Sequence, residues 1–245
     1  MKTMDIFLYK CTLKTKEPLF FASKEVSRNF ITVPYIGNYA LAYATGVVEQ
    51  SYQGSSSPRY REDLSGAGDL YIFPARFIDF RWHTESFNCV GEGYFLQMGQ
   101  NIVIDAQKYL EEVQGKTRPP VFNSPQMGTF KMIASESVAI FYVLARKKIS
   151  LPRYIRLGKL MTKCRLECTP VSNFEVRKSE FFVEHPLNPA DLSREYLIKS
   201  YSTISVKPVP LIEGVRMEGV YIAFGETCLP LHVGYFLYMK GEEAG

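Results

Sequence analysis

The sequence contains no long apolar run. Its longest uninterrupted apolar stretch, residues 138–145, has eight residues, whereas a membrane-spanning helix needs about 20. The N-terminal stretch MKTMDIFLYKCTLKTKE is interrupted by Asp5 and Lys10, so we do not expect a secretory signal peptide. These absences exclude a helical membrane protein and favour a cytoplasmic location.

Cysteine is too scarce and too scattered for a disulfide framework or a metal site. The chain has five cysteines, an odd number with irregular spacing, which predicts reduced thiols. Cys164 and Cys168 form a C-x-x-x-C pair without a second pair or a nearby histidine, so we interpret them as two small core residues and expect no metal. The full set is Cys11, Cys89, Cys164, Cys168 and Cys228.

Phosphate-binding glycine motifs are also absent. Gly158-Lys159 is followed by Leu160, where a P-loop has Ser or Thr. Gly115-Lys116-Thr117 lacks the upstream glycine of that motif, because Leu110 stands there. We therefore exclude an NTPase or a dinucleotide-dependent enzyme and expect no cofactor.

Histidine offers little for catalysis. The chain has three, His83, His185 and His232, and each is available as a general base for metal-free RNA cleavage. None lies in a recognisable motif, and structural histidines are much more common than catalytic ones. We predict no catalytic residue.

The composition is that of an ordinary soluble protein with many strands. Of the 245 residues, 46% are apolar and 22% are charged, values typical of globular domains. Aromatic residues make up 14%, which favours β-structure. We find no repeat and no boundary within the chain, and therefore predict one domain over residues 1–245.

Residue periodicity predicts an α+β fold. Residues 4–15 alternate with one fully apolar face, which is typical of a strand, and residues 35–48 have the apolar spacing of an amphipathic helix. Residues 129–133 and 138–145 flank the short stretch ASES and predict a hairpin. Further strands are expected at 69–82 on both sides of Pro74 and at 173–183, 201–209, 219–224 and 231–239, short helices at 105–113 and after the cap Asn188, and loops at 51–68 and 116–128.

Positive charge is concentrated in one segment. Residues 146–165 contain eight basic residues and no Asp or Glu. The net charge is +4, so the rest of the chain carries 4 − 8 = −4. A basic segment on a slightly acidic body is typical of a protein that binds a polyanion. A solvated face is the alternative, but such faces usually interleave both signs.

The segment YIRLGKLMTKCRLE fits both a strand and a helix. As strands, its apolar residues are odd-numbered before Gly158 and even-numbered after it, which a turn at the glycine explains. Lys159, Met161, Lys163 and Arg165 then share one face. As a helix, the cations lie opposite an apolar stripe. Gly158 and the preceding Pro152 favour turn and strand, and both interpretations place the cations on one side.

Several segments together resemble the Csc-one family, the Cas-five-type subunits that cap the handle in type I-D CRISPR Cascade complexes. They occur in the family's order, from near the N-terminus to about residue 192. The Leu157-Gly158-Lys159 turn is also similar to the Leu-Gly-basic turn of wider Cas-five proteins, although Leu160 and Met161 replace the arginines that often follow. The segments are LFFASKE, VPYIGNYALAYATG, YIRLGKLMTK and HPLNPADL.

The resemblance implies a RAMP fold, which is an RRM-like or ferredoxin-like antiparallel sheet with a long inserted hairpin, or thumb. We expect this insertion within residues 51–128. It also implies a non-catalytic subunit that grips the five-prime handle of the guide crRNA. Such a subunit bridges the large and backbone subunits, near the place where target DNA is opened.

The residues expected to fill this role supply positive charge and an aromatic ring. Guide specificity comes from base pairing, so the protein needs phosphate contacts and aromatic stacking rather than base readout. An endoribonuclease that processes repeat RNA, as some Cas-five relatives do, is the alternative function, and an assembly protein whose basic face meets an acidic neighbour is a third. The predicted RNA-binding residues are Arg153, Tyr154, Arg156, Lys159, Lys163 and Arg165, with Lys116 and Arg118 on the insertion.

Overall fold

A computed structural model describes most of the chain outside residues 104–125. The residues described are 6–26, 29–48, 63–64, 69–89, 95–96, 102–103, 126–207 and 209–234. The helix predicted at 105–113 and most of the loop at 51–68 lie outside these residues, as do Lys116 and Arg118. The loop predicted at 116–128 lies outside them up to residue 125 and is wrong over 126–128, which begin the strand Gln126–Ile133.

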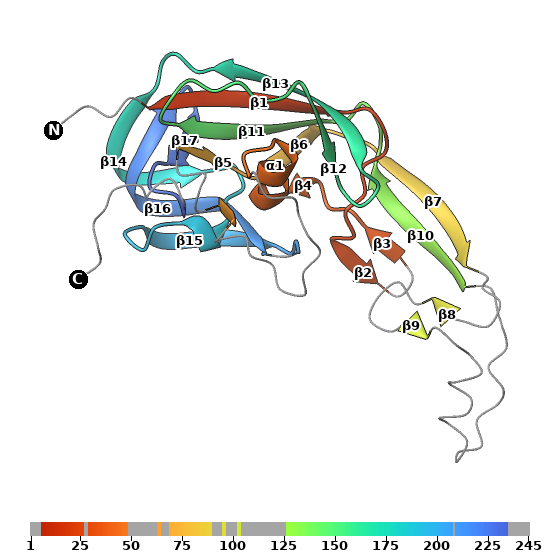
Figure 1. Cartoon of the computed structure of the whole chain (residues 1–245). Coiled ribbons are helices and arrows are strands. Elements are labelled where there is room, and N and C mark those ends of the chain that lie inside the picture. Colours follow the sequence, from red (N-terminus) through yellow and green to blue (C-terminus); the bar gives the residue numbers. More distant parts are fainter. Residues whose placement is uncertain are drawn as a thin grey trace.

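The largest sheet has seven strands, and β1 lies near its middle (Figure 1). β1 pairs with β11 on one side and β13 on the other, and every pairing in this sheet is antiparallel. The order is β12-β13-β1-β11-β6-β4, with β5 also on β11. The strands are β1 (Phe7–Thr15), β4 (Tyr35–Ile36), β5 (Leu70–Ile72), β6 (Ala75–Asp79), β11 (Val138–Ala145), β12 (Tyr154–Leu157) and β13 (Thr162–Pro170).

The alternation of residues in β1 accounts for its place in the sheet. Tyr9, Cys11 and Leu13 are buried, as the predicted apolar face requires, whereas Lys10 is exposed. Fully burying a side chain the size of Leu13 contributes roughly 1.5–3 kcal/mol. α1 (Asn38–Ala44) packs on β5 and β12 and is shorter than the predicted helix, because Tyr35 and Ile36 form β4 and the helix begins after Gly37.

A long antiparallel ribbon extends away from the main sheet (Figure 1). It consists of β7 (Trp82–Cys89) and β10 (Gln126–Ile133), and β10 also pairs in parallel with β3 (Asn29–Ile31). The hairpin predicted from 129–133 and 138–145 is therefore wrong. Both segments are strands, but β10 and β11 belong to different sheets. The remaining elements near the ribbon are β2 (Lys24–Val26), β8 (Phe95–Leu96) and β9 (Ile102–Val103).

A third sheet forms the C-terminal part of the described chain, with order β14-β16-β15 and β17 on β16. As predicted, a short helix begins after Asn188, whose side chain accepts a hydrogen bond from the Ala190 N–H. The strand predicted at 231–239 is wrong over 231–234, and its remainder is outside the described residues. The elements are β14 (Glu175–Val183), the 3-10 helix η1 (Pro189–Asp191), β15 (Leu197–Ile204), β16 (Leu211–Phe224) and β17 (Thr227–Pro230).

A buried carboxylate connects this C-terminal part to α1 and β5. Asp191 accepts hydrogen bonds from Asn38 Nδ2 at 2.6 Å, from the Tyr39 hydroxyl at 2.8 Å and from the Tyr71 hydroxyl at 3.1 Å. A buried charge is tolerated only when such donors surround it. The network therefore fixes η1 against the main sheet.

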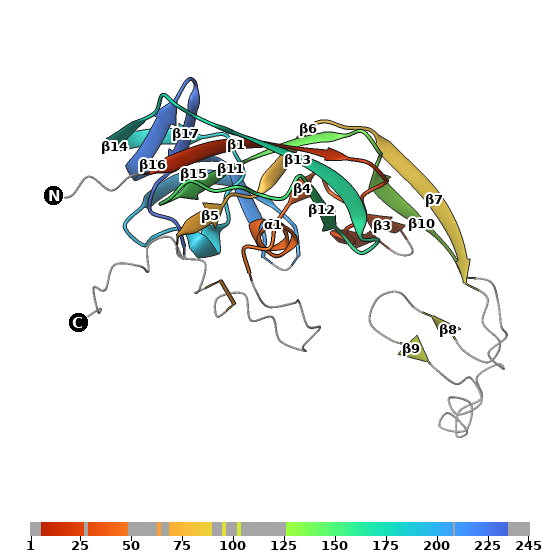
Figure 2. The ribbon, with the colours of Figure 1, turned by 45° about the horizontal axis from the view of Figure 1, so that its top comes forward.

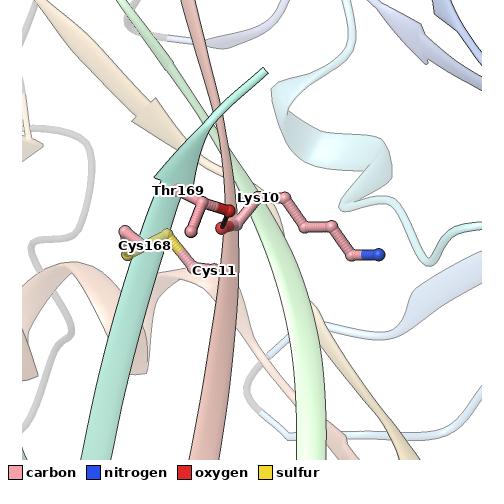
Figure 3. The surroundings of a disulfide bond; sticks show 4 residues. All are labelled: Lys10, Cys11, Cys168 and Thr169. Atoms are coloured by element: carbon pink, nitrogen blue, oxygen red, sulfur yellow. Dashed lines mark hydrogen bonds between the residues drawn. A yellow bond between two sulfur atoms is a disulfide. The ribbon is translucent and has the colours of Figure 1, made fainter.

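A disulfide joins two neighbouring strands of the main sheet and corrects the prediction of reduced thiols. Cys11 of β1 and Cys168 of β13 are directly paired, with their Cα atoms 4.1 Å apart, and their sulfurs are bonded (Figure 3). Beside them, the Thr169 hydroxyl donates to the Lys10 carbonyl at 3.3 Å. The interpretation of Cys168 as a core thiol is wrong. Cys164 is a buried free thiol, as predicted.

No helix in the described part of the chain is both long enough and apolar enough to cross a membrane.

Candidate nucleic-acid interface

The basic segment forms a tight β-hairpin rather than a helix. β12 and β13 pair from Tyr154↔Arg165 to Leu157↔Thr162, and residues 158–161 make the turn. Gly158 has φ +73° and Met161 has φ +52°, so the turn requires left-handed backbone at both ends. This confirms the prediction that the register changes at Gly158.

The turn is fixed by the chain segment that follows β1. The Lys159 N–H donates to the Phe20 carbonyl at 2.8 Å, and the Thr162 hydroxyl donates to the Pro18 carbonyl at 2.7 Å. A Cβ at Gly158 would lie 2.5 Å from the Phe20 oxygen. Glycine is therefore required here both by its φ and by the close approach of another backbone.

Gly158→Ala should lower the free energy of unfolding by about 2 kcal/mol, since it adds backbone strain and displaces the Phe20 carbonyl. Gly225→Ala is the matched control, because Gly225 has φ +52° but open space around its Cβ. Chemical denaturation of both variants checks this. An equal loss in both would show that contact with Phe20 contributes nothing.

One face of the hairpin packs into the core, and the other faces solvent. Ile155, Leu157, Cys164 and Leu166 are buried. On the opposite face, Tyr154 is paired with Arg165, and Arg156 is paired with Lys163. Four predicted site residues are therefore brought together on one surface. We call this surface the hairpin face, and it consists of Tyr154, Arg156, Lys163 and Arg165.

The other two predicted residues of the segment lie beside this face. Arg153 is exposed just before β12, and Lys159 is exposed in the turn. Lys159 and Met161 do not continue the row of Lys163 and Arg165, as the strand interpretation expected, because the turn occupies residues 158–161.

Most of these cations have no acidic partner within the part of the chain that the structure describes. Arg165 forms an ion pair with Glu167 of its own strand. Within the described residues, Arg153, Arg156, Lys159 and Lys163 have no carboxylate in ion-pair contact. Outside the hairpin but in the same basic segment, Lys147 pairs with Asp69. The hairpin face therefore carries a net positive charge that is open to an anionic ligand.

Two contacts hold side chains of the hairpin face in place. The Lys163 ammonium lies 4.7 Å from the centroid of the Tyr154 ring, a cation–π contact that contributes about 0.5–1 kcal/mol at an exposed site. Arg156 Nη1 donates to the Met161 carbonyl at 3.0 Å. Tyr154 has 46% of its surface exposed. It is therefore not a core residue, and its ring is accessible for stacking.

Two lysines outside the basic segment also lie beside the hairpin. Lys14 of β1 is directly paired with Arg165, and the Lys16 N–H donates to the Lys163 carbonyl at 2.9 Å. More than a hundred residues separate these lysines from the basic segment. Their only sequence signal is the polar alternation of β1, and only strand pairing places them beside the hairpin.

The described residues contain no metal-binding cluster of His, Cys, Asp or Glu. Cys164 is buried, and burial raises the pKa of its thiol to about 12, with a smaller contribution from Glu17. This thiol is inert at neutral pH.

The three histidines lie in three different environments. His185 is buried, and its Nε2 bonds the Pro74 carbonyl at 2.8 Å. Burial is the main cause that lowers the pKa of His185 to about 3; the Pro74 hydrogen bond opposes this shift, and the nearby Arg76 charge adds to it. His232 Nδ1 lies 2.9 Å from Glu195 Oε2, and His83 is exposed on β7. None of the three belongs to the hairpin face.

Comparison with known proteins places the chain in a family. The family model described as Type I-D CRISPR-associated protein Cas5/Csc1 matches residues 6–237, and no curated protein matches. Among solved structures, a CRISPR protein from Archaeoglobus fulgidus is 11% identical with a TM-score of 0.39, over 93% of this chain and 99% of that one. A chain of the Type III-B Cmr-beta complex bound to cognate target RNA and AMPPnP is 14% identical with a TM-score of 0.36, over 85% of this chain and 86% of that one. Since the family model covers nearly the whole sequence, the chain belongs to the type I-D CRISPR-associated Cas5/Csc1 family.

Proposed function

We propose that this chain is a non-catalytic RNA-binding subunit of a cytoplasmic type I-D CRISPR effector complex. In that complex it holds the five-prime handle of the crRNA and bridges the large subunit and the backbone subunits. The observation that carries the proposal is the hairpin face, where two guanidinium groups, one ammonium group and one exposed aromatic ring lie together.

The chemistry of this face suits single-stranded RNA. Phosphate contacts supply sequence-independent affinity, and aromatic rings accept any base by stacking. Arg156 and Lys163 lie opposite one another across the two strands, so a phosphodiester over the hairpin can contact both. Tyr154, held beside Lys163, offers its ring to a neighbouring base.

We further propose that the main sheet is ferredoxin-like. β1 lies between β11 and β13, α1 follows β1, and β5 and β6 pair with β11. This is the strand order of a β-α-β-β-α-β fold. The second helix of that fold is replaced by residues 146–153 and β12. In this proposal the β7–β10 ribbon is the base of the thumb, which continues past the predicted limit of 128 to Ile133.

The arrangement of histidines supports a non-catalytic role. General-base cleavage of RNA needs a proton acceptor beside the 2′-hydroxyl. His185 is buried away from the hairpin face, while His83 and His232 lie on other elements.

Replacing Arg156, Lys159 and Lys163 with Gln together should weaken binding of single-stranded RNA at least about tenfold. The slope of log affinity against log salt concentration should also become shallower by about 2, since each lost phosphate contact removes about 0.7. The wild-type slope is expected near −3.5, which corresponds to about five phosphate contacts. Fluorescence anisotropy of a labelled repeat RNA at several salt concentrations measures both values.

The matched control removes the same charge elsewhere. Arg177, Lys178 and Lys199 lie on β14 and β15 of the third sheet, and their replacement with Gln should leave the affinity and the slope nearly unchanged. Equal losses in the two triple variants would show that net charge, rather than the hairpin face, governs binding. Site-specific cleavage of the RNA in EDTA would instead support the endoribonuclease.

A further inference from the structure

Two lysines bind the same carboxylate at the edge of the hairpin face. Lys14 lies in β1, and Lys16 follows it. Glu136, in the bend between β10 and β11, accepts from Lys14 Nζ at 2.6 Å and from Lys16 Nζ at 2.9 Å. All three side chains are accessible, with exposed fractions of 41% for Lys14, 33% for Lys16 and 50% for Glu136. The hydrogen bonds from Lys14 and then Lys16 lower the pKa of Glu136 to about 2. We call these three residues the Glu136 cluster.

The backbone holds Glu136 in this position. Its N–H donates to the Thr15 carbonyl at 2.7 Å, and its φ is +64°. Left-handed backbone is uncommon for a residue other than glycine. The bend therefore places a carboxylate between two lysines at the end of β1, and the contact is part of the folded chain.

The Glu136 cluster continues the hairpin face across the sheet. Tyr154, Arg165 and Lys14 are paired in one lateral row over β12, β13 and β1. These strands lie side by side in both views of the ribbon (Figures 1 and 2). Because neighbouring strands are about 4.8 Å apart, Lys14 lies about 10 Å from Tyr154 along this row. A strand of RNA that crosses the hairpin therefore meets Lys14 and Lys16 next.

We infer that Lys14 and Lys16 form a further phosphate-binding position of the RNA interface, and that the Glu136 carboxylate occupies this position until a phosphate displaces it. The inference rests on the proposed function of the hairpin face. It makes Glu136 an internal competitor that reduces affinity for RNA.

A phosphate can take the place of the Glu136 carboxylate and keep the same kind of contact with the two lysines. A carboxylate and a phosphate both accept charge-assisted hydrogen bonds from ammonium groups. The cluster lies in water, where an exposed ion pair contributes little net stability, so a phosphate held by the rest of the interface can replace Glu136 at small cost. A phosphate that is not also held by the rest of the interface gains little by replacing Glu136. The cluster therefore favours RNA that also binds the hairpin face.

The test compares two variants with opposite expected effects on the full chain. Lys14→Gln with Lys16→Gln should weaken binding of a labelled single-stranded RNA about tenfold and make the log–log salt slope shallower by about 1.4. Glu136→Asn should tighten binding about threefold to tenfold, because both lysines are then free. Asn tolerates left-handed backbone, and Glu136→Gln serves as a second variant should Glu136→Asn fail to fold. Lys178→Gln with Lys199→Gln is the control and should change neither quantity.

The opposite signs separate competition from a structural role. If Glu136 only stabilised the bend, its neutral variants would bind RNA no better than the wild type, and this result overturns the inference. Unchanged binding in the Lys14/Lys16 variant, together with loss in the Arg156/Lys159/Lys163 variant, overturns the inference but leaves the proposed function intact. Unchanged binding in both overturns the proposed function as well.

Discussion

Reduction of the Cys11–Cys168 disulfide is expected to lower the free energy of unfolding by about 5 kcal/mol. The two cysteines are 157 residues apart, and closing so long a loop restricts the unfolded chain by about this amount. Chemical denaturation with and without a dithiol reductant measures the difference. The loss should accompany weaker RNA binding near the unfolding midpoint, because β13 carries Lys163 and Arg165.

Cysteine variants make this experiment specific. Cys168→Ser should resemble the reduced wild type and should not respond to the reductant. Cys228→Ser is the matched control, because Cys228 is also partly exposed but forms no disulfide, and it should respond as the wild type does. Equal unfolding midpoints for oxidised and reduced wild type would mean that the two thiols are not joined in solution.

The local structure of the hairpin could be predicted from the sequence, but its surroundings could not. The change of apolar register at Gly158 reports the turn directly, because a side chain in a strand faces the core only at every second residue. That Lys14 lies beside Arg165 depends on strand order, which alternation within a strand does not encode. For the same reason the pairing of Cys11 with Cys168 was missed. The count of cysteines bears on redox state but not on which two residues meet.

The hairpin predicted between 129–133 and 138–145 failed for a related reason. Both strands were identified, and the short link between them favours a hairpin. The link is instead a bend at which the chain passes from the ribbon to the main sheet, so β10 pairs with β7 while β11 pairs with β1. Competition among long-range partners therefore decided the pairing. In the same bend Glu136 meets Lys14 and Lys16, so the missed pairing and the missed part of the site share one cause.

The buried His185 should make the protein sensitive to mild acid. Its pKa is about 3 in the folded protein and near 6.5 in the unfolded chain. Between these values the unfolded chain binds a proton that the folded protein does not, so stability is complete above pH 6.5 and falls as the pH falls. At about 1.4 kcal/mol per pH unit, the loss reaches about 2 kcal/mol at pH 5 and about 3 kcal/mol at pH 4.

In the upper part of this pH range, the contribution of His185 to the free energy of unfolding is separated from the contributions of the carboxylates. Glu136 and Glu180 have lowered pKa values, so their contributions are lost only in stronger acid. The neutral imidazole bonds Pro74 and packs on Tyr142 and Phe73, and protonation would place a charge in this apolar environment beside the Arg76 charge.

Denaturation of the wild type and two variants between pH 7.5 and pH 5 tests this account. His185→Gln keeps a neutral N–H donor and should lose most of the pH dependence in this range, whatever its stability at pH 7.5. His83→Gln, at an exposed position on β7, should keep the dependence of the wild type. An equally steep fall in His185→Gln would assign the acid sensitivity to another group. Since an imidazole with so low a pKa is a weak proton acceptor near pH 7, the same measurement also bears on whether His185 can act as a general base.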